Sequence, residues 1–370
     1  GVIFSSHTVG IGIKHFEIVV GTPGTRFVDA YMSNWDDLNV LLSSIGVRGL
    51  TASTSIFGTI YFRNGVYKLG GGTKPAGISF VGGSSVVFVL DGVGSQMLHV
   101  YGSTNANDEI RNIIFDAGGQ EFNNLLVIQR NYSRIVDCTF TGGQKGLDSS
   151  GGGYLGVINS SRTYSKIYAD KWRDYSDVTN TGTFFFFNST NVYFQMDSGE
   201  YDHVGAGNSS IVIRSCRNVK ISNGIWRYVG NNFVLVHSSS SDIFIERNEI
   251  HRNKPVGNIG TIALGHTSIS GMAFSSMTSV SYNTFFSEES IAGSIIGTQD
   301  GGQTMKGLLV EGNRSINNGS GSPTFLNIVA DVFGTVAKGN TITHHVTFIS
   351  DSGVGTKSVS LGNFVENIEQ

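Results

Sequence analysis

The sequence predicts an all-β fold, a right-handed parallel β-helix of about ten to eleven coils. Two observations of composition support this prediction: Gly accounts for 50 of the 370 residues and Pro for only 4. Tight turns between short strands need glycine, and a hydrogen-bonded sheet disfavours proline. A third observation is a strand pattern that recurs at intervals of 23 to 35 residues. A solenoid of such repeats grows along one axis, so a chain of this length needs no second core.

The repeat consists of an apolar-alternating strand, a small polar residue (the anchor) and another short strand. The clearest copies are IFIERNEI (243–250), SVSYNTF (279–285), LLVEGNRS (308–315) and VAKGNTI (336–342). Their anchors and the next one are Asn248, Asn283, Asn313, Asn340 and Asn363, and the upstream anchors are Gly83, Asp116, Cys138, Asp170, Asp197 and Gly224. Asn suits a corner between strands, and stacked Asn side chains form a ladder. The alternative, a β-sandwich with Asn-rich turns, shows turn signals about every 8–12 residues and no longer period.

Before the repeats, NWDDLNVLLSSIG (34–46) has the pattern of a short amphipathic helix. Asn34 is a suitable N-cap, Asp36 and Asp37 lie in the first turn, and Gly46 is a suitable stop. Such a helix would cover the open end of the first coil and protect its strand edge. We therefore expect an N-terminal segment with a capping helix over residues 1–57 and a parallel β-helix over residues 58–370.

The segment GTIYFRNGVYKLGG (58–71) follows as an alternating strand pair with a turn at Asn64-Gly65. A D-D-x-x-x-L helix before a G-T-I-Y-F-x-x-G-x-Y-x-L strand pair and β-helix coils resembles the pectate-lyase-like superfamily, and within it bacteriophage tailspikes and tail appendages. The residues that carry the resemblance are Asp36, Asp37, Leu41, Gly58, Thr59, Phe62, Gly65, Tyr67 and Leu69. The resemblance implies a homotrimer that binds, and often cleaves, bacterial surface polysaccharide. It carries no catalytic motif.

Charge and composition exclude several classes. The net charge is −3, the pI is about 6.3, and no basic stripe is present, so nucleic acid is not expected as a partner. No apolar run approaches 18 residues, which argues against membrane insertion. Cys138 and Cys216 lie far apart, so no disulfide framework is indicated. The polygalacturonase motifs are missing, since Gly265-His266-Thr267 lacks the second Gly, and no cluster with metal-ligand spacing occurs. We expect no metal and no cofactor.

The repeat allows distant residues to be aligned in columns along the axis. The column three residues after the anchor holds Arg173, Glu200, Arg227 and His251, and the next column holds Asp174, Tyr201, Tyr228 and Arg252. Trp172 and Trp226 lie two residues after their anchors. Aromatic rings stack on sugar C–H faces, while Arg and carboxylates bind hydroxyl or uronate groups. The predicted sugar-contacting strip comprises Arg173, Asp174, Tyr201, Trp226, Arg227, Tyr228, His251 and Arg252.

The candidate catalytic residues are Glu200, Asp202 and Glu249. Inverting glycosidases hold their two carboxyl groups about 6.5–9.5 Å apart, and retaining ones about 5–5.5 Å. Glu200 and Asp202 on one strand would be about 6–7 Å apart, and Glu200 and Glu249, two coils apart, nearer about 9–10 Å. The competing interpretations are a solvated charge ladder and, for the Trp residues, the core. Glu288, Glu289 and Asp300 in the longest coil are weaker candidates for a loop site.

The sequence thus favours a receptor-binding tailspike or tail appendage of a bacterial virus, a homotrimer at the virion tail that recognises, and as a further option hydrolyses, cell-surface polysaccharide. Two alternatives stay open. The first is a non-enzymatic structural or adhesive appendage. The second is a secreted bacterial polysaccharide lyase, which would create an unsaturated product that absorbs in the ultraviolet.

Overall fold

The computed structural model of the chain is all-β in its described part, and no helix occurs there. The structure describes residues 16–20, 25–32, 55–69, 72–74, 77–90, 96–101, 108–117, 124–129, 132–141, 145–149, 154–163, 185–188, 193–202, 209–214, 216–229, 232–237, 240–252, 260–266, 277–288, 293–298, 304–329, 331–344, 347–352 and 358–366. The predicted capping helix (34–46) lies outside these residues.

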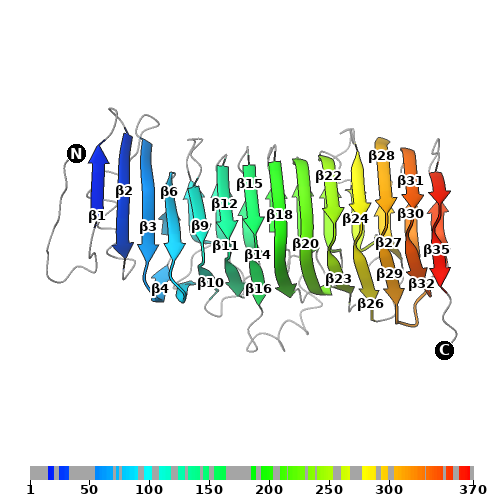
Figure 1. Ribbon diagram of the computed structural model, residues 1–370, viewed down its shortest axis with the longest axis horizontal. Coiled ribbons are helices and arrows are strands. Elements are labelled where there is room, and N and C mark those ends of the chain that lie inside the picture. The colour runs from blue at the N-terminus through cyan, green and yellow to red at the C-terminus, as the bar shows by residue number, and fades with distance from the viewer. Residues whose placement is uncertain are drawn as a thin grey trace. The chain divides into compact units, whose positions relative to one another are not determined.

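The chain divides into two compact units, residues 1–163 and 164–370, and each is built from three parallel sheets. Each coil contributes one strand to sheet 1, turns a sharp corner into sheet 2, and then reaches sheet 3. Apart from the first strand of the chain, the strands pair in parallel with those of the neighbouring coil, so the strands within a unit follow one another in chain order (Figure 1). This arrangement confirms the predicted parallel β-helix. The predicted division at residue 57 stays a prediction.

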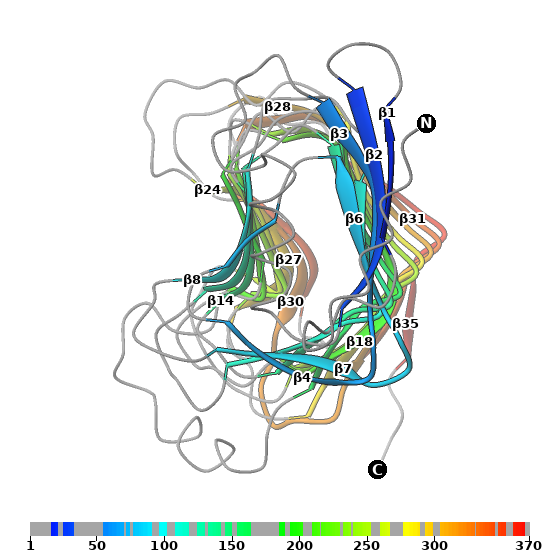
Figure 2. The same cartoon turned by 90° about the vertical axis from the view of Figure 1, so that its left-hand side faces the viewer.

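In unit 1, β1 (Phe16–Val20) pairs antiparallel with the first strand of sheet 1, and all other strand pairs are parallel. Figure 2 shows the strands of this unit lying one behind another. Sheet 1 contains β2 (Thr25–Met32), β3 (Ser55–Phe62), β6 (Ile78–Gly82), β9 (Asp108–Arg111), β12 (Tyr132–Val136) and β15 (Tyr154–Ile158). Sheet 2 contains β4 (Gly65–Leu69), β7 (Val86–Leu90), β10 (Ile114–Asp116), β13 (Thr139–Thr141) and β16 (Ser161–Thr163). Sheet 3 contains β5 (Gly72–Lys74), β8 (Gln96–Tyr101), β11 (Asn124–Gln129) and β14 (Lys145–Ser149).

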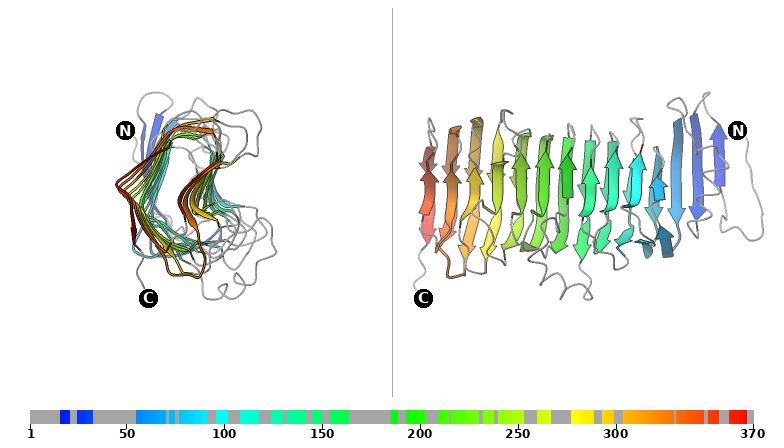
Figure 3. Two further views of the ribbon diagram at one scale, coloured as in Figure 1. Left: turned by 90° about the vertical axis from the view of Figure 1, so that its right-hand side faces the viewer. Right: turned by 180° about the vertical axis from the view of Figure 1, so that it is seen from behind.

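In unit 2, β18 (Tyr193–Asp202) and β20 (Arg217–Val229) run through the corner and belong to both sheet 1 and sheet 2. The stacked strands of this unit are visible from its C-terminal side in Figure 3. Sheet 1 continues with β22 (Ser241–Glu246), β25 (Thr278–Ser281), β28 (Thr304–Glu311), β31 (Asp331–Lys338) and β34 (Ser358–Leu361). Sheet 2 continues with β23 (Glu249–Arg252), β26 (Thr284–Ser287), β29 (Arg314–Asn317), β32 (Thr341–Thr343) and β35 (Phe364–Glu366). Sheet 3 contains β17 (Phe185–Asn188), β19 (Ile211–Arg214), β21 (Val234–His237), β24 (Ile262–His266), β27 (Ser294–Thr298), β30 (Thr324–Ile328) and β33 (Thr347–Asp351).

The corner between sheets 1 and 2 is made by two residues, of which the first has a left-handed backbone and the second is the anchor. The left-handed residues include Asn112, Asp137 and Asn159 in unit 1, and Ser198, Asn223, Arg247, Tyr282, Gly312, Gly339 and Gly362 in unit 2. Most of them are Asn, Asp, Ser or Gly, the residue types that tolerate this conformation best. The left-handed residue therefore precedes the anchor, and the anchor itself points inward.

The predicted asparagine ladder is confirmed in unit 2. Each side-chain Oδ1 accepts from the backbone N–H of the preceding anchor, at 2.9 Å for Asn248 to Asn283, Asn283 to Asn313, Asn313 to Asn340 and Asn340 to Asn363. The same oxygens accept from the preceding Asn Nδ2 at 2.9–3.1 Å. Each Nδ2 also donates to a backbone carbonyl of sheet 1 in the preceding coil. Coils of 23 to 35 residues are thereby held in one register.

Two predicted anchors were wrong. Gly199, not Asp197, lies opposite Gly224, because Ser198 takes the left-handed position. Ile113, not Asp116, follows the left-handed Asn112 and is buried. Ser160 is an anchor that the sequence analysis missed. Its hydroxyl oxygen accepts a hydrogen bond from the backbone N–H of Cys138 at 3.2 Å. The predicted anchor Asp170 lies outside the described residues, and the predicted number of coils stays a prediction.

Aromatic side chains of sheet 2 fill the interior beside the corner. In unit 1, Phe88, Phe115 and Phe140 follow one another with ring centroids 5.8 and 5.3 Å apart. In unit 2, the Tyr201 and Trp226 rings stack at 4.2 Å. Both sets of rings are buried. Stacking of inward residues from coil to coil is the packing that a solenoid needs, because each coil buries its apolar face only on its neighbours.

Candidate functional site

Four of the side chains singled out in the sequence, Glu200, Arg227, Glu249 and His251, gather on the outward face of sheet 2 in unit 2. We call this surface the lateral band, and it comprises Glu200, Ile225, Arg227, Glu249, His251, Phe286 and Glu288. These residues come from the ends of β18 and β20, from β23 and from β26, with Glu288 directly after β26. Alternation along each strand puts their side chains outside, opposite the buried Tyr201, Trp226, Ile250 and Phe285.

The register of the lateral band differs from the prediction. Glu200, Arg227 and His251 were expected in one file. Glu200 instead pairs with Ile225, which pairs with Glu249. The shift follows from the corrected anchor, Gly199 rather than Asp197. Glu200 and Glu249 are therefore two strand spacings apart, about 9–10 Å between their backbones, which is the spacing expected of them.

Two sets of polar contacts organise the lateral band. Arg227 Nη1 donates to Glu200 Oε2 at 2.9 Å, so a diagonal contact replaces the predicted file. His251 lies between two carboxylates, with Nε2 2.7 Å from Glu249 Oε1 and Nδ1 3.3 Å from Glu288 Oε1. Carboxylates only accept, so a neutral imidazole donates to one of them and an imidazolium to both. The His251 ring also stacks on Phe286 with centroids 4.6 Å apart and an interplanar angle of 12°.

Three residues predicted to contact sugar face the interior instead. Tyr201 and Trp226 are 1% exposed, and Arg252 is 2% exposed. Arg252 Nη1 donates to Thr261 Oγ1 at 3.0 Å, and burial lowers the pKa of its guanidinium to about 10. Burial likewise raises the pKa of the Tyr201 phenol. Because these side chains lie on the inward side of the pleat, their assignment to the sugar-contacting strip was wrong.

Four further candidates cannot be assigned a position in the lateral band. Arg173 and Asp174 lie outside the described residues. Asp202 and Tyr228 lie in β18 and β20, but their side chains are not described. In the backbone register, Asp202 lies opposite Arg227. The roles predicted for these four residues stay predictions.

The lateral band contains three residues that the column analysis missed, Ile225, Phe286 and Glu288. Phe286 was hidden because a Phe-Phe pair does not show which ring points inward; the register settles it, since Phe285 lies opposite Ile250 and is buried. Glu288 was assigned to a loop of the longest coil rather than to the band. A sequence signal for the latter two existed in the strict alternation after Asn283, which puts Thr284, Phe286 and Glu288 on one side.

The contacts of the lateral band hold three of its carboxylates in place. His251 occupies the space between Glu249 and Glu288 and hydrogen-bonds to both. Glu200 is held by Arg227. The band therefore presents planar donors and acceptors around the apolar side chains of Ile225 and Phe286, which is the mixture that binds hydroxyl groups and C–H faces.

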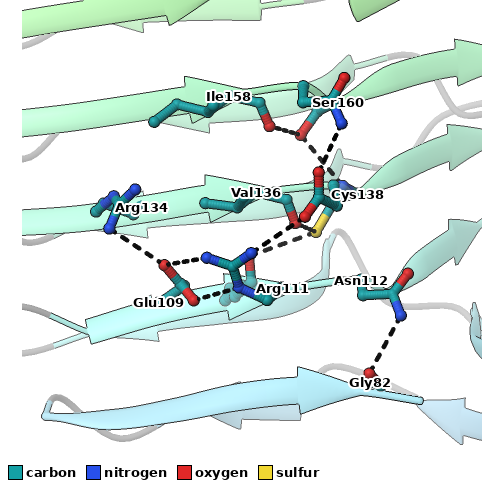
Figure 4. Close-up of polar contacts among 12 residues, drawn as sticks. Gly82, Glu109, Arg111, Asn112, Arg134, Val136, Cys138, Ile158 and Ser160 are labelled. Atoms are coloured by element: carbon teal, nitrogen blue, oxygen red, sulfur yellow. Dashed lines mark hydrogen bonds and ion pairs between the residues drawn. The ribbon is translucent and has the colours of Figure 1, made fainter. Parts of the chain in front are cut away.

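Unit 1 carries a second charged cluster on its sheet 1, shown in Figure 4. Arg111 contacts Glu109 at 2.7 Å and Asp137 at 3.2 Å, and Arg134 contacts Glu109 at 3.4 Å. The hydrogen bond with Glu109 raises the pKa of Arg111. Two arginines balance two carboxylates, so this cluster is a neutral surface network of small energetic weight. It is not a candidate binding site.

Within the described ranges, no group of three or more His, Cys, Asp or Glu side chains could hold a metal ion. The described part likewise contains no helix long and apolar enough to cross a membrane. Cys138 and Cys216 are free and buried, and burial raises the pKa of Cys138 to about 12. A thiol in that state is a packing residue rather than a nucleophile.

Together the fold and the lateral band define a parallel β-helix protein with a polar side surface. No protein-family model and no curated protein sequence matches the chain. Among solved structures, the chain is similar to a DFA-IIIase of Arthrobacter chlorophenolicus A6 without its lid, with 9% identity, a TM-score of 0.51, and coverage of 95% of this chain and 97% of that one. It is also similar to the surface protein and adhesin PfbA of Streptococcus pneumoniae, with 12% identity, a TM-score of 0.49, and coverage of 90% and 94%. An alginate lyase of Paenibacillus sp. str. FPU-7 shares 12% identity with a TM-score of 0.39 and coverage of 91% and 97%. At such low identity, the likeness concerns the fold alone.

Proposed function

We propose that the lateral band binds the sugar units of a polysaccharide. The observation that carries the proposal is the His251–Phe286 stack, held on the outer surface between Glu249 and Glu288. The exposed side-chain fractions of Glu249 and Glu288 are both 47%, so their free oxygens face solvent. An apolar patch with a rim of fixed acceptors and one guanidinium matches a pyranose, which combines C–H faces with hydroxyl groups.

The finer proposal is a tailspike-like appendage of a bacterial virus that acts outside the cell at the host surface as a homotrimer. The support for it is the front motif, GTIYFRNGVYKLGG. In unit 1 this motif forms β3, the first corner and β4, and its Phe62 and Tyr67 rings pack at 5.2 Å. The trimer rests on the sequence resemblance.

The test uses the whole chain and a panel of capsular polysaccharides and O-antigens from candidate hosts. Retardation of the chain in gels that contain each polymer measures binding. We expect at least one polymer to retard the chain, and Arg227→Gln to weaken that binding about 10-fold or more, since a charge-assisted hydrogen bond contributes about 1.5–3 kcal/mol. The matched control is Arg217→Gln on the same strand, because Arg217 is exposed outside the lateral band and its loss leaves the band intact.

Two outcomes would contradict binding at the lateral band. One is that no polymer of the panel retards the chain. The other is that Arg227→Gln and Arg217→Gln bind equally well. The same incubations, followed by sizing of the polymer and by ultraviolet absorbance, separate the enzymatic alternatives: shorter chains with new reducing ends indicate a hydrolase, and an absorbing product indicates a lyase.

A further inference from the structure

A second surface of unit 2 has an aromatic side chain in an unusual place. Tyr282 is the left-handed corner residue of its coil, with φ of 57°. Its side chain is 53% exposed. The other left-handed positions of this unit's corner hold Ser, Asn, Arg or Gly. An aromatic residue adopts this conformation at a conformational cost, and an exposed ring recovers little of that cost through core burial. Such an outlier points to a function.

The Tyr282 ring lies across the corner of the next coil. A Cβ atom at Gly312 would be 2.6 Å from both Cδ1 and Cε1 of Tyr282. The ring therefore rests on the bare backbone of Gly312, and any other residue there would displace it. Because the side chain is still half exposed, the ring offers a surface to solvent. This is the geometry of a stacking platform, on which a sugar ring can lie.

The charges around this ring are predominantly positive. The backbone bonds from Arg247 N to Ser281 O and from Tyr282 N to Glu311 O put the neighbouring coils on either side of the ring. Beside the corner, the neighbouring coils carry the cations Arg247, Arg314 and Lys338 and the anions Glu246 and Glu311, so the sum is 3 − 2 = +1. Each glutamate already faces a lysine, at 2.8 Å for Lys220–Glu246 and 2.9 Å for Lys338–Glu311. Arg247 Nη1 also lies 3.8 Å from Glu246 Oε1, so the positive excess at this corner is one charge.

Lys338 and the two arginines lie on coils beside the Tyr282 ring. The hydrogen bond from Glu311 raises the pKa of Lys338, and the Tyr282 phenol adds to the effect. Because the Tyr282 ring lies over Gly312 of the next coil, the ring extends along the axis toward the coil of Lys338. Arg247, with a side chain 59% exposed, lies on the coil before Tyr282, and Arg314 lies on the coil after it, opposite Thr284.

We propose that this surface, comprising Tyr282, Gly312, Arg247, Arg314 and Lys338 (the Tyr282 corner), is a second saccharide-binding site that takes a carboxylate-bearing sugar. The sugar ring stacks on Tyr282, and its carboxylate pairs with Arg247 or Arg314. The site goes beyond the function proposed for the lateral band, because it centres on the corner residue Tyr282, shares no residue with that band and specifies an acidic sugar. Neither site requires the other.

The test measures binding of uronate hexasaccharides to the whole chain by calorimetry. The probes are hexamers of galacturonate, mannuronate and hyaluronan, with cellohexaose as the neutral comparison. We expect at least one uronate hexamer to bind about 10-fold more tightly than cellohexaose, and its affinity to fall as salt is raised. Tyr282→Asn should weaken that binding about 10-fold, whereas Tyr282→Phe should keep it, because Phe retains the ring.

Tyr282→Asn is chosen because Asn tolerates a left-handed backbone, so this variant should fold with unchanged or higher thermal stability. Arg217→Gln, which lies outside both surfaces, serves as the matched control and should leave uronate binding unchanged. The proposal is overturned if none of the three uronates binds, if cellohexaose binds equally well, or if Tyr282→Asn binds like the unmodified chain. A loss with Arg227→Gln but not with Tyr282→Asn would assign uronate binding to the lateral band instead.

Discussion

The asparagine ladder makes a quantitative prediction about Asn313. This side chain is 1% exposed and takes part in four hydrogen bonds. Its Oδ1 accepts from the backbone N–H of Asn283 at 2.9 Å and from Asn283 Nδ2 at 3.1 Å. Its Nδ2 donates to Val280 O at 2.8 Å and to Asn340 Oδ1 at 3.0 Å. Asn313→Ala removes all four bonds at once.

The expected loss in the free energy of unfolding depends on which hydrogen-bond partners of Asn313 find no replacement in the variant. Asn283 Nδ2 keeps its bond to Ile245 O, and Asn340 Oδ1 keeps the backbone N–H of residue 313. The backbone N–H of Asn283 loses its acceptor, and Val280 O loses one donor. Each buried polar group that loses its partner costs about 1–3 kcal/mol, so we expect Asn313→Ala to lower the free energy of unfolding by about 2–5 kcal/mol.

Two control variants calibrate this value. Asn363 is the last member of the ladder and only half-buried, so water can replace its side chain, and Asn363→Ala should cost about 1 kcal/mol. Asn318 is exposed, and Asn318→Ala should change stability by no more than about 0.5 kcal/mol. Guanidinium unfolding followed by far-UV circular dichroism measures all three. Equal losses for Asn313→Ala and Asn318→Ala would refute the ladder as a source of stability.

Two further predictions concern the core. Gly224→Ala should lower the free energy of unfolding by about 1–3 kcal/mol through overpacking. The new Cβ would lie 2.6 Å from Trp226 Nε1, and the indole cannot easily move because the Tyr201 ring stacks on it. An unfolding midpoint equal to that of the unmodified chain would contradict this prediction. The raised pKa of Cys138, about 12, means that the folded state holds this proton longer than the unfolded state, whose thiol titrates near about 8.5. The stabilisation is present below that pH and is lost as the pH rises toward about 12. Cys138→Ala should therefore reduce the fall in the free energy of unfolding between about pH 8.5 and about pH 10.5. Parallel curves of unfolding free energy against pH for the variant and the unmodified chain would argue against this prediction.

Much of the fold could be read from the chain. The asparagines from 248 to 363 identified one corner of five successive coils, and the structure joins them by hydrogen bonds. The strand pair at 58–71 and its apolar alternation are present as β3 and β4. These features are legible because a ladder demands the same side chain at each step, and because an alternating strand repeats its pattern every second residue.

The register failed where the corner carried no such side chain. At Gly199 and Ile113 the anchor lacks a polar group, so the nearest acidic residue drew the alignment to Asp197 and Asp116. An error of two residues keeps a side chain on its face of the strand but changes its neighbours along the axis. This is why Glu200 was correctly expected outside and yet misplaced against Arg227.

The sequence by itself determined the architecture, the ladder and the outward direction of Glu200, Arg227, Glu249 and His251, because all of these follow from local alternation and a repeated corner. Only the tertiary structure decided which outward side chains meet. The contact of His251 with Phe286 and Glu288, and the position of the Tyr282 ring over Gly312, join residues of different coils. Coil lengths vary from 23 to 35 residues, so contacts between coils depend on a register that no single segment of the chain contains.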